Sequence, residues 1–69
     1  MDISARNQLA GKVIKITLGG VMAEVTVDIG NGNEIVAAIT RASVERMGLQ
    51  EGAEVVAIIK ATEVMIGAR

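Results

Sequence analysis

The chain has 69 residues, enough for one domain at most, and its formal net charge at pH 7 is −1. Its 7 Lys and Arg residues are scattered singly among 8 Asp and Glu residues, so no broad basic surface for nucleic acid is expected. The absence of His and Cys excludes imidazole proton shuttling at neutral pH and soft-metal ligation. The absence of aromatic residues excludes a base-stacking platform for single-stranded nucleic acid.

The apolar content is high for so short a chain. Hydrophobic residues make up 51% of the sequence and the mean hydropathy is +0.47, yet neither a disulfide nor a common zinc site is available as support. A domain of this size buries only about 60% of the surface that its unfolded chain exposes. No uncharged apolar run approaches the ~18 residues of a membrane span. We therefore expect an obligate homo-oligomer, with a tightly packed monomer as the alternative.

Apolar and polar residues alternate along the first half of the chain, which predicts β-strands. The first expected strand covers residues 12–18, with Ile14, Ile16 and Leu18 on one face and Val13, Lys15 and Thr17 on the other. Gly19-Gly20 then predicts a two-residue hairpin turn, because glycine tolerates positive φ at both positions.

The second expected strand covers residues 21–29 and has one continuous apolar face, formed by Val21, Ala23, Val25, Val27 and Ile29. Residues 30–33 predict another hairpin turn, with Asn-Gly at its centre. Residues 35–39 are apolar on both faces, which is typical of a strand that is covered on both sides.

The pattern then changes to that of a short helix over residues 42–47, with Thr40 as its N-cap and Gly48 as its C-terminal stop. Alternation returns over residues 54–60, and residues 64–66 are expected to form a final short strand. Five strands with one helix between the third and fourth predict an all-β, oligonucleotide/oligosaccharide-binding (OB)-like Greek-key barrel. Strand exchange between subunits would explain the long apolar strands, so we expect it to complete the barrel.

The first candidate site combines Ser4 and Arg6 near one end of the chain with Lys60 near the other. Arg and Lys supply positive charge and N–H donors, and Ser adds a hydroxyl. Ala5 and Ala61 have almost no side chain, so an anion could approach their backbone amides closely. This donor set suits a tetrahedral oxyanion. The alternative is that Arg6 and Lys60 are solvated surface charges or form an ion pair with Glu63 or Glu24.

A second donor group is Thr40 with Ser43, which flank the start of the expected helix. Unpaired N–H groups at a helix N-terminus favour an anion. Simple N-capping needs no ligand, and the sequence alone favours capping over anion binding at this position.

Several separated motifs together resemble the Mop family of small molybdate-binding proteins, the molbindins. They are Ser4–Leu9 (Ser-Ala-Arg-Asn-Gln-Leu), Gly11–Val13, Ile39-Thr40 with Ser43, Gly48-Leu49 with Gly52, and Lys60–Thr62. Their order and spacing are similar to the family pattern across essentially the whole chain, so a single Mop (TOBE-like) domain over residues 1–69 is expected. Position 61 is Ala here, where some relatives have Ser, which would remove one hydroxyl donor.

The resemblance implies an OB-type barrel assembled as a homohexamer, a trimer of dimers, with oxyanions between subunits. Carried over to this chain, the molybdate-binding residues would be Ser4, Ala5, Arg6, Lys60 and Ala61 of one subunit, with Thr40 and Ser43 of a neighbour. Molybdate is the expected ligand and tungstate its expected substitute. The implied role is intracellular molybdenum storage or homeostasis.

An enzyme is not expected, because no nucleophile lies beside a plausible general base. No nucleic-acid or membrane partner is expected. The alternative function is a small swapped-strand DNA-binding or scaffold protein, which generally presents a basic face that this chain lacks. Met1-Asp2-Ile3 opens with an acid and no apolar segment follows, so the cytoplasm is the expected compartment.

Overall fold

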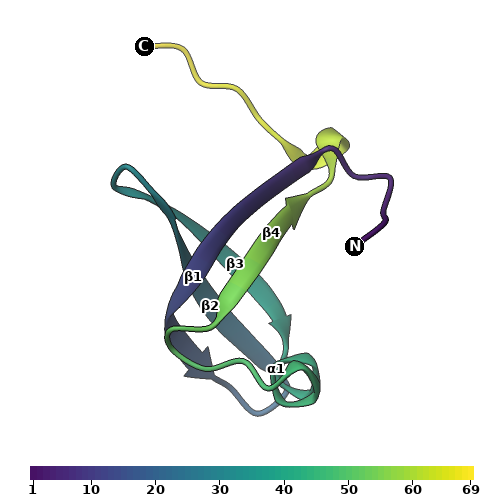
Figure 1. The fold of residues 1–69 in the computed structure, drawn as a ribbon, viewed down its shortest axis with the longest axis vertical. Helices are drawn as coiled ribbons and strands as arrows, with labels where there is room; N and C mark the ends of the chain where they lie inside the picture. Colours follow the sequence, from purple (N-terminus) through teal and green to yellow (C-terminus); the bar gives the residue numbers. More distant parts are fainter.

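The computed structural model describes residues 1–69 and consists of one curled antiparallel sheet and one short helix (Figure 1). The elements are β1 (Asn7–Leu18), β2 (Met22–Gly30), β3 (Asn33–Thr40), α1 (Arg41–Met47), β4 (Glu54–Ile59) and the 3₁₀ turn η1 (Ala61–Glu63). The strand order is β3-β2-β1-β4, so the long strand β1 pairs with both β2 and β4. The helix follows the third strand, where the sequence predicted it.

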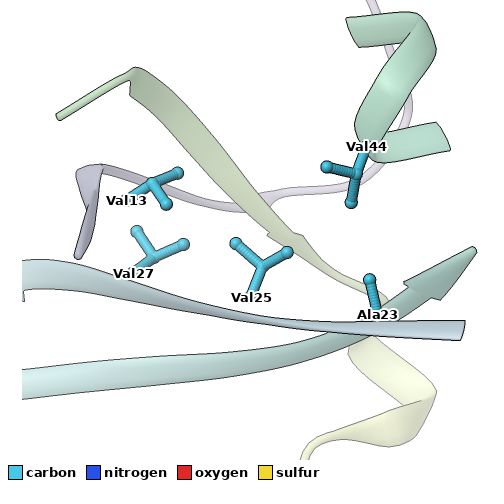
Figure 2. Packing of buried hydrophobic residues seen from close by; sticks show 5 residues of the cluster. All are labelled: Val13, Ala23, Val25, Val27 and Val44. Carbon is cyan, nitrogen blue, oxygen red and sulfur yellow. The ribbon is translucent and has the colours of Figure 1, made fainter. Parts of the chain in front are cut away.

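The buried core is very small. Only five residues are buried, namely Val13, Ala23, Val25, Val27 and Val44. Three of them lie on the face of β2 that was predicted to be apolar, and Val44 of α1 packs over them (Figure 2). By contrast, Val36 on β3 and Val56 and Ile58 on β4 are largely exposed. The two-sided apolar strands therefore have one face that this chain does not cover.

A β-bulge changes which residues of β1 face the core. The pairing of β1 with β2 shifts register between Val13 and Lys15. As a result Val13 is 1% exposed and Ile16 packs against the core, whereas Ile14 is 42% exposed. The predicted face of Ile14, Ile16 and Leu18 was therefore wrong, because the extra residue of a bulge breaks the period of two.

The two hairpin turns differ in outcome. Asn31 and Gly32 have φ values of 55° and 77°, which confirms the predicted Asn-Gly turn. Neither Gly19 nor Gly20 has positive φ, so the predicted two-residue turn there was wrong and the loop has three residues between the strands. Gly19 is needed for space instead, because an added Cβ would lie 2.8 Å from the carbonyl oxygen of Met22.

The helix boundaries agree with the sequence prediction. The Thr40 hydroxyl accepts a hydrogen bond from the Ser43 N–H at 3.0 Å, which makes Thr40 the N-cap. Gly48 has a φ of 63° and its N–H donates to the Glu45 carbonyl, so it ends the helix in the left-handed conformation. No helix in the structure is long and apolar enough to cross a membrane.

The predicted fifth strand is absent from the sheet. Residues 64–66 form no strand, so the chain supplies four strands rather than five. The C-terminal segment extends away from the sheet (Figure 1), and Met65 and Ile66 are 90% and 91% exposed. A strand needs an adjacent strand to pair with, and the folded chain by itself offers residues 64–66 none, so a fifth strand stays a prediction for the assembly.

An apolar cavity of about 460 Å³ lies where β3 and β4 face each other without pairing. Its lining is entirely hydrophobic and comes from residues 35–39 and 55–59, with Val13, Val25, Val27, Met47 and Leu49. The barrel is therefore open along one seam, which we call the β3–β4 slot. Strand exchange stays a prediction at this point.

The tight packing of β1 against β2 at Gly11 provides a test of the fold. An added Cβ on Gly11 would clash with the Asp28 carbonyl oxygen and lie 2.8 Å from Val27 Cγ1, whereas nothing lies within 4 Å of one on Gly20. We expect Gly11→Ala to lower the free energy of unfolding by about 1–3 kcal/mol and Gly20→Ala to change it by less than about 0.5 kcal/mol. Urea unfolding at one fixed protein concentration measures the free energy of unfolding of both variants. Equal effects of the two substitutions would contradict the tight packing of Gly11 against Val27 and Asp28.

Candidate functional site

The two ends of the predicted site meet because of the pairing between β1 and β4. Asn7, the first residue of β1, pairs with Ile59, the last residue of β4. The segments just outside this pair are therefore neighbours, although they are more than fifty positions apart in the sequence. Together they line a cavity of about 500 Å³, formed by Ser4, Ala5, Arg6, Asn7, Lys60, Ala61 and Thr62.

We call this the terminal cavity. It gathers the predicted residues Ser4, Ala5, Arg6, Lys60 and Ala61, but not Thr40 or Ser43. Both of its cations are exposed, and neither forms an ion pair; the chain's one ion pair joins Arg41 to Glu45 at 3.6 Å. The alternative of an ion pair from Arg6 or Lys60 to Glu63 or Glu24 is therefore wrong for this chain. The positive charge of the terminal cavity is not neutralised by its own carboxylates.

Backbone donors add to this charge. The turn η1 begins at Ala61, and its first hydrogen bond runs from the Glu63 N–H to the Lys60 carbonyl at 2.9 Å. The N–H groups of Ala61 and Thr62 come before this bond, so they have no acceptor within the turn. The small side chain of Ala61 leaves its amide accessible. The terminal cavity therefore offers backbone N–H groups beside two fixed cations, a combination that suits an anion.

Sequence reasoning missed two lining residues, Asn7 and Thr62. Both lie inside the motifs that carried the family resemblance, and the pairing of Asn7 with Ile59 is the signal that could have found them. Thr62 adds a hydroxyl donor. Asn7 adds an amide that presents either N–H donors or an acceptor oxygen, depending on its rotation. The lining is therefore rich in donors but does not consist of donors alone.

Thr40 and Ser43 lie at the opposite end of the molecule. Thr40 ends β3 and pairs with Met22, which lies close to the C-terminal end of β1. The terminal cavity adjoins the opposite, N-terminal end of β1. Figure 1 shows α1 and η1 at opposite ends of the sheet, in a chain whose longest dimension is 36 Å. A single chain therefore does not bring the two donor groups together.

The capping interpretation of Thr40 and Ser43 is confirmed. Besides accepting the Ser43 N–H, the Thr40 hydroxyl donates to the Ser43 Oγ at 2.7 Å. One hydroxyl hydrogen of the pair is used in this bond, and the other remains available for another acceptor. Within this pair, one hydroxyl donor is therefore free to bind an anion.

Comparison with known proteins identifies the family. The TOBE domain model matches residues 3–66. Molybdenum-pterin-binding protein 1 of Clostridium pasteurianum is 53% identical over 66 residues, which are 96% of this chain and 97% of that relative. The structure of a molybdate-binding protein from Sporomusa ovata matches with a TM-score of 0.91 and 44% identity, over 99% of this chain and all of the other.

The structure of the cytoplasmic molybdate-binding protein ModG, solved with molybdate bound, also matches this fold. Its TM-score is 0.84 at 44% identity, over 88% of this chain and 43% of the ModG chain. These likenesses confirm a mostly β, OB-like fold with one short helix, although this chain supplies four strands by itself. The chain therefore belongs to the TOBE-domain family and, within it, to the Mop proteins that its motifs resemble.

Proposed function

We propose that this protein binds molybdate reversibly, as an intact oxyanion, at junctions between identical subunits. The observation that carries the proposal is the terminal cavity, where Arg6 and Lys60 lie beside backbone N–H groups and form no ion pair with a carboxylate. The names of the related proteins give the chemical identity of the anion. Binding needs only hydrogen bonds and charge, because the chain has no groups of His, Cys, Asp and Glu that could ligate a metal ion directly.

Arg6 and Lys60 supply charge that roughly balances a dianion, and Ser4 and Thr62 supply hydroxyl donors. In one chain most of these groups are exposed to water. An oxyanion is strongly hydrated, so a site that captures it gains from excluding solvent. We propose that Thr40 and Ser43 of a neighbouring subunit close the terminal cavity, with the free hydroxyl hydrogen of the pair pointing to the anion.

The assembly follows from the open seam of the barrel. The β3–β4 slot is wholly apolar, and both strands that border it have an unpaired edge. The same chain carries Val64, Met65 and Ile66 on an extended, exposed segment. We propose that this segment enters the slot of a partner and adds the missing fifth strand, that the partner does the same in return, and that three such dimers form a hexamer.

We propose the bare oxyanion, and not a molybdenum-pterin, as the ligand of this chain. Pterins are flat ring systems, and protein sites commonly hold such rings by aromatic stacking. The chain has no Phe, Tyr or Trp. We therefore propose non-enzymatic storage or homeostasis of molybdate in the cytoplasm, the compartment of the related protein ModG. No observation favours the DNA-binding or scaffold alternative.

Removal of either cation tests the site. We expect Arg6→Ala and Lys60→Ala each to weaken molybdate binding roughly 10- to 100-fold, because each removes a charge-assisted hydrogen bond. Lys15→Ala is the matched control, since Lys15 is exposed and lies in the middle of β1. Native mass spectrometry with added molybdate reports subunit number and bound oxyanions together. Unchanged molybdate stoichiometry in both site variants would rule out the terminal cavity.

Removal of the exposed segment tests the assembly. We expect a chain that ends at Glu63 to lose the oligomer, because the β3–β4 slot then has no strand to fill it. A chain that lacks only Ala68 and Arg69 serves as the control and is expected to keep the subunit number of the full chain. Light scattering after size-exclusion chromatography measures both. An unchanged oligomer in the shorter chain would contradict strand exchange.

Competition among anions tests selectivity. Tungstate matches molybdate in size and charge, so we expect it to displace labelled molybdate at equal concentration in equilibrium dialysis. Sulfate is smaller, so donors that are spaced for molybdate bind it poorly. Phosphate is partly protonated at neutral pH, and a buried proton without an acceptor is costly. Displacement by sulfate at equal concentration would refute the size argument, and displacement by phosphate would indicate that the Asn7 oxygen accepts that proton.

A further inference from the structure

One side-chain hydrogen bond holds the segment that precedes β1. The Gln8 Nε2 donates to the Ala5 carbonyl oxygen at 2.6 Å, and no other side-chain hydrogen bond reaches residues 1–6. No backbone hydrogen bond fixes residues 4–6 either, because these residues belong to no strand or helix and none of the bonds outside those elements includes them. The conformation of this wall of the terminal cavity therefore depends on Gln8.

Gln8 is close to the terminal cavity but does not line it, whereas Asn7 does. Successive side chains in a strand point to opposite faces, so Asn7 turns towards the cavity and Gln8 turns away from it. This alternation would place the Ala5 carbonyl oxygen that Gln8 holds on the side away from the cavity.

Because the peptide bond is planar, the direction of the Ala5 carbonyl also fixes the direction of the Arg6 N–H. In a trans peptide the carbonyl and the following N–H point in opposite directions, and this chain has no cis peptide bond. With the Ala5 carbonyl drawn outward by Gln8, the N–H of Arg6 is directed to the cavity side. An outward carbonyl removes an oxygen that would repel an oxyanion, and an inward N–H adds a donor.

We propose that Gln8 is a positioning residue that turns the Ala5–Arg6 peptide so that it presents a donor, and not an acceptor, to the anion. This inference rests on the proposed function, because it assumes that the terminal cavity holds molybdate. It extends the site to a residue that never touches the ligand. It also explains why an exposed amide lies directly behind a cavity that is otherwise lined by charge and hydroxyl groups.

Gln8→Met tests the proposal without a change of charge, since Met has a similar length but no N–H donor. We expect the dissociation constant for molybdate to rise roughly three- to tenfold, the range expected when one hydrogen bond is lost. Gln50→Met is the matched control, because Gln50 is exposed and its side chain makes no hydrogen bond. Isothermal titration calorimetry of the full-length assembly measures the affinity of each variant.

A second readout separates positioning from general loosening of the structure. In the unmodified protein the ¹⁵N–¹H signal of Arg6 is expected to shift on addition of molybdate, and in Gln8→Met this shift is expected to shrink while the subunit number and melting temperature stay unchanged. A full Arg6 shift with unchanged affinity in Gln8→Met would overturn the positioning role. If the unmodified protein itself binds no molybdate, the proposed function fails instead, so the two failures are distinguishable.

Discussion

The chain carries more apolar surface than it can bury alone, and this constraint governs the rest of its structure. More than half of its residues are hydrophobic, yet only five are buried. Burial of a Val or Ile side chain stabilises a fold or an interface by on the order of 1.5–3 kcal/mol. Burial of the exposed faces of β3 and β4 against another copy would therefore be strongly favourable. No disulfide compensates for the small core. Association with further copies is the direct way in which such a chain gains stability.

The same constraint bears on the proposed site, which a second chain would complete. The charged cavity sits at the start of β1, and the N-cap pair sits at the far end of the sheet, beside α1. A site divided between the two ends of a chain is useful only when another copy brings the opposite end near. An apolar interface also removes the water that would otherwise screen Arg6 and Lys60. In the proposed assembly, apolar burial and anion capture thus depend on one step.

Local chemistry predicted from the sequence was correct at the helix caps and at the Asn-Gly turn, but wrong at Gly19-Gly20. Thr40 and Gly48 bound the helix, and Asn31-Gly32 forms its turn, because caps and turns are set within a few positions. The bulge after Val13 and the absence of a fifth strand over residues 64–66 depend on distant partners, which a pattern along one chain does not contain. The site follows the same rule: the motifs gave Arg6 and Lys60, whereas Asn7 and Thr62 needed the pairing of β1 with β4.

A site that is shared between subunits couples binding to assembly. If an anion contacts two chains, it binds the assembled form better than the separate chains, and by linkage it stabilises the assembly to the same extent. The two cations of an empty terminal cavity repel each other, and a dianion between them removes this repulsion. The coupling between anion binding and assembly therefore has two sources, the contacts of the anion with both chains and the removal of repulsion between the two cations. In the proposed assembly of a chain with so small a core, both contributions act at the contact between subunits, so a change at the anion site would alter the stability of the whole assembly.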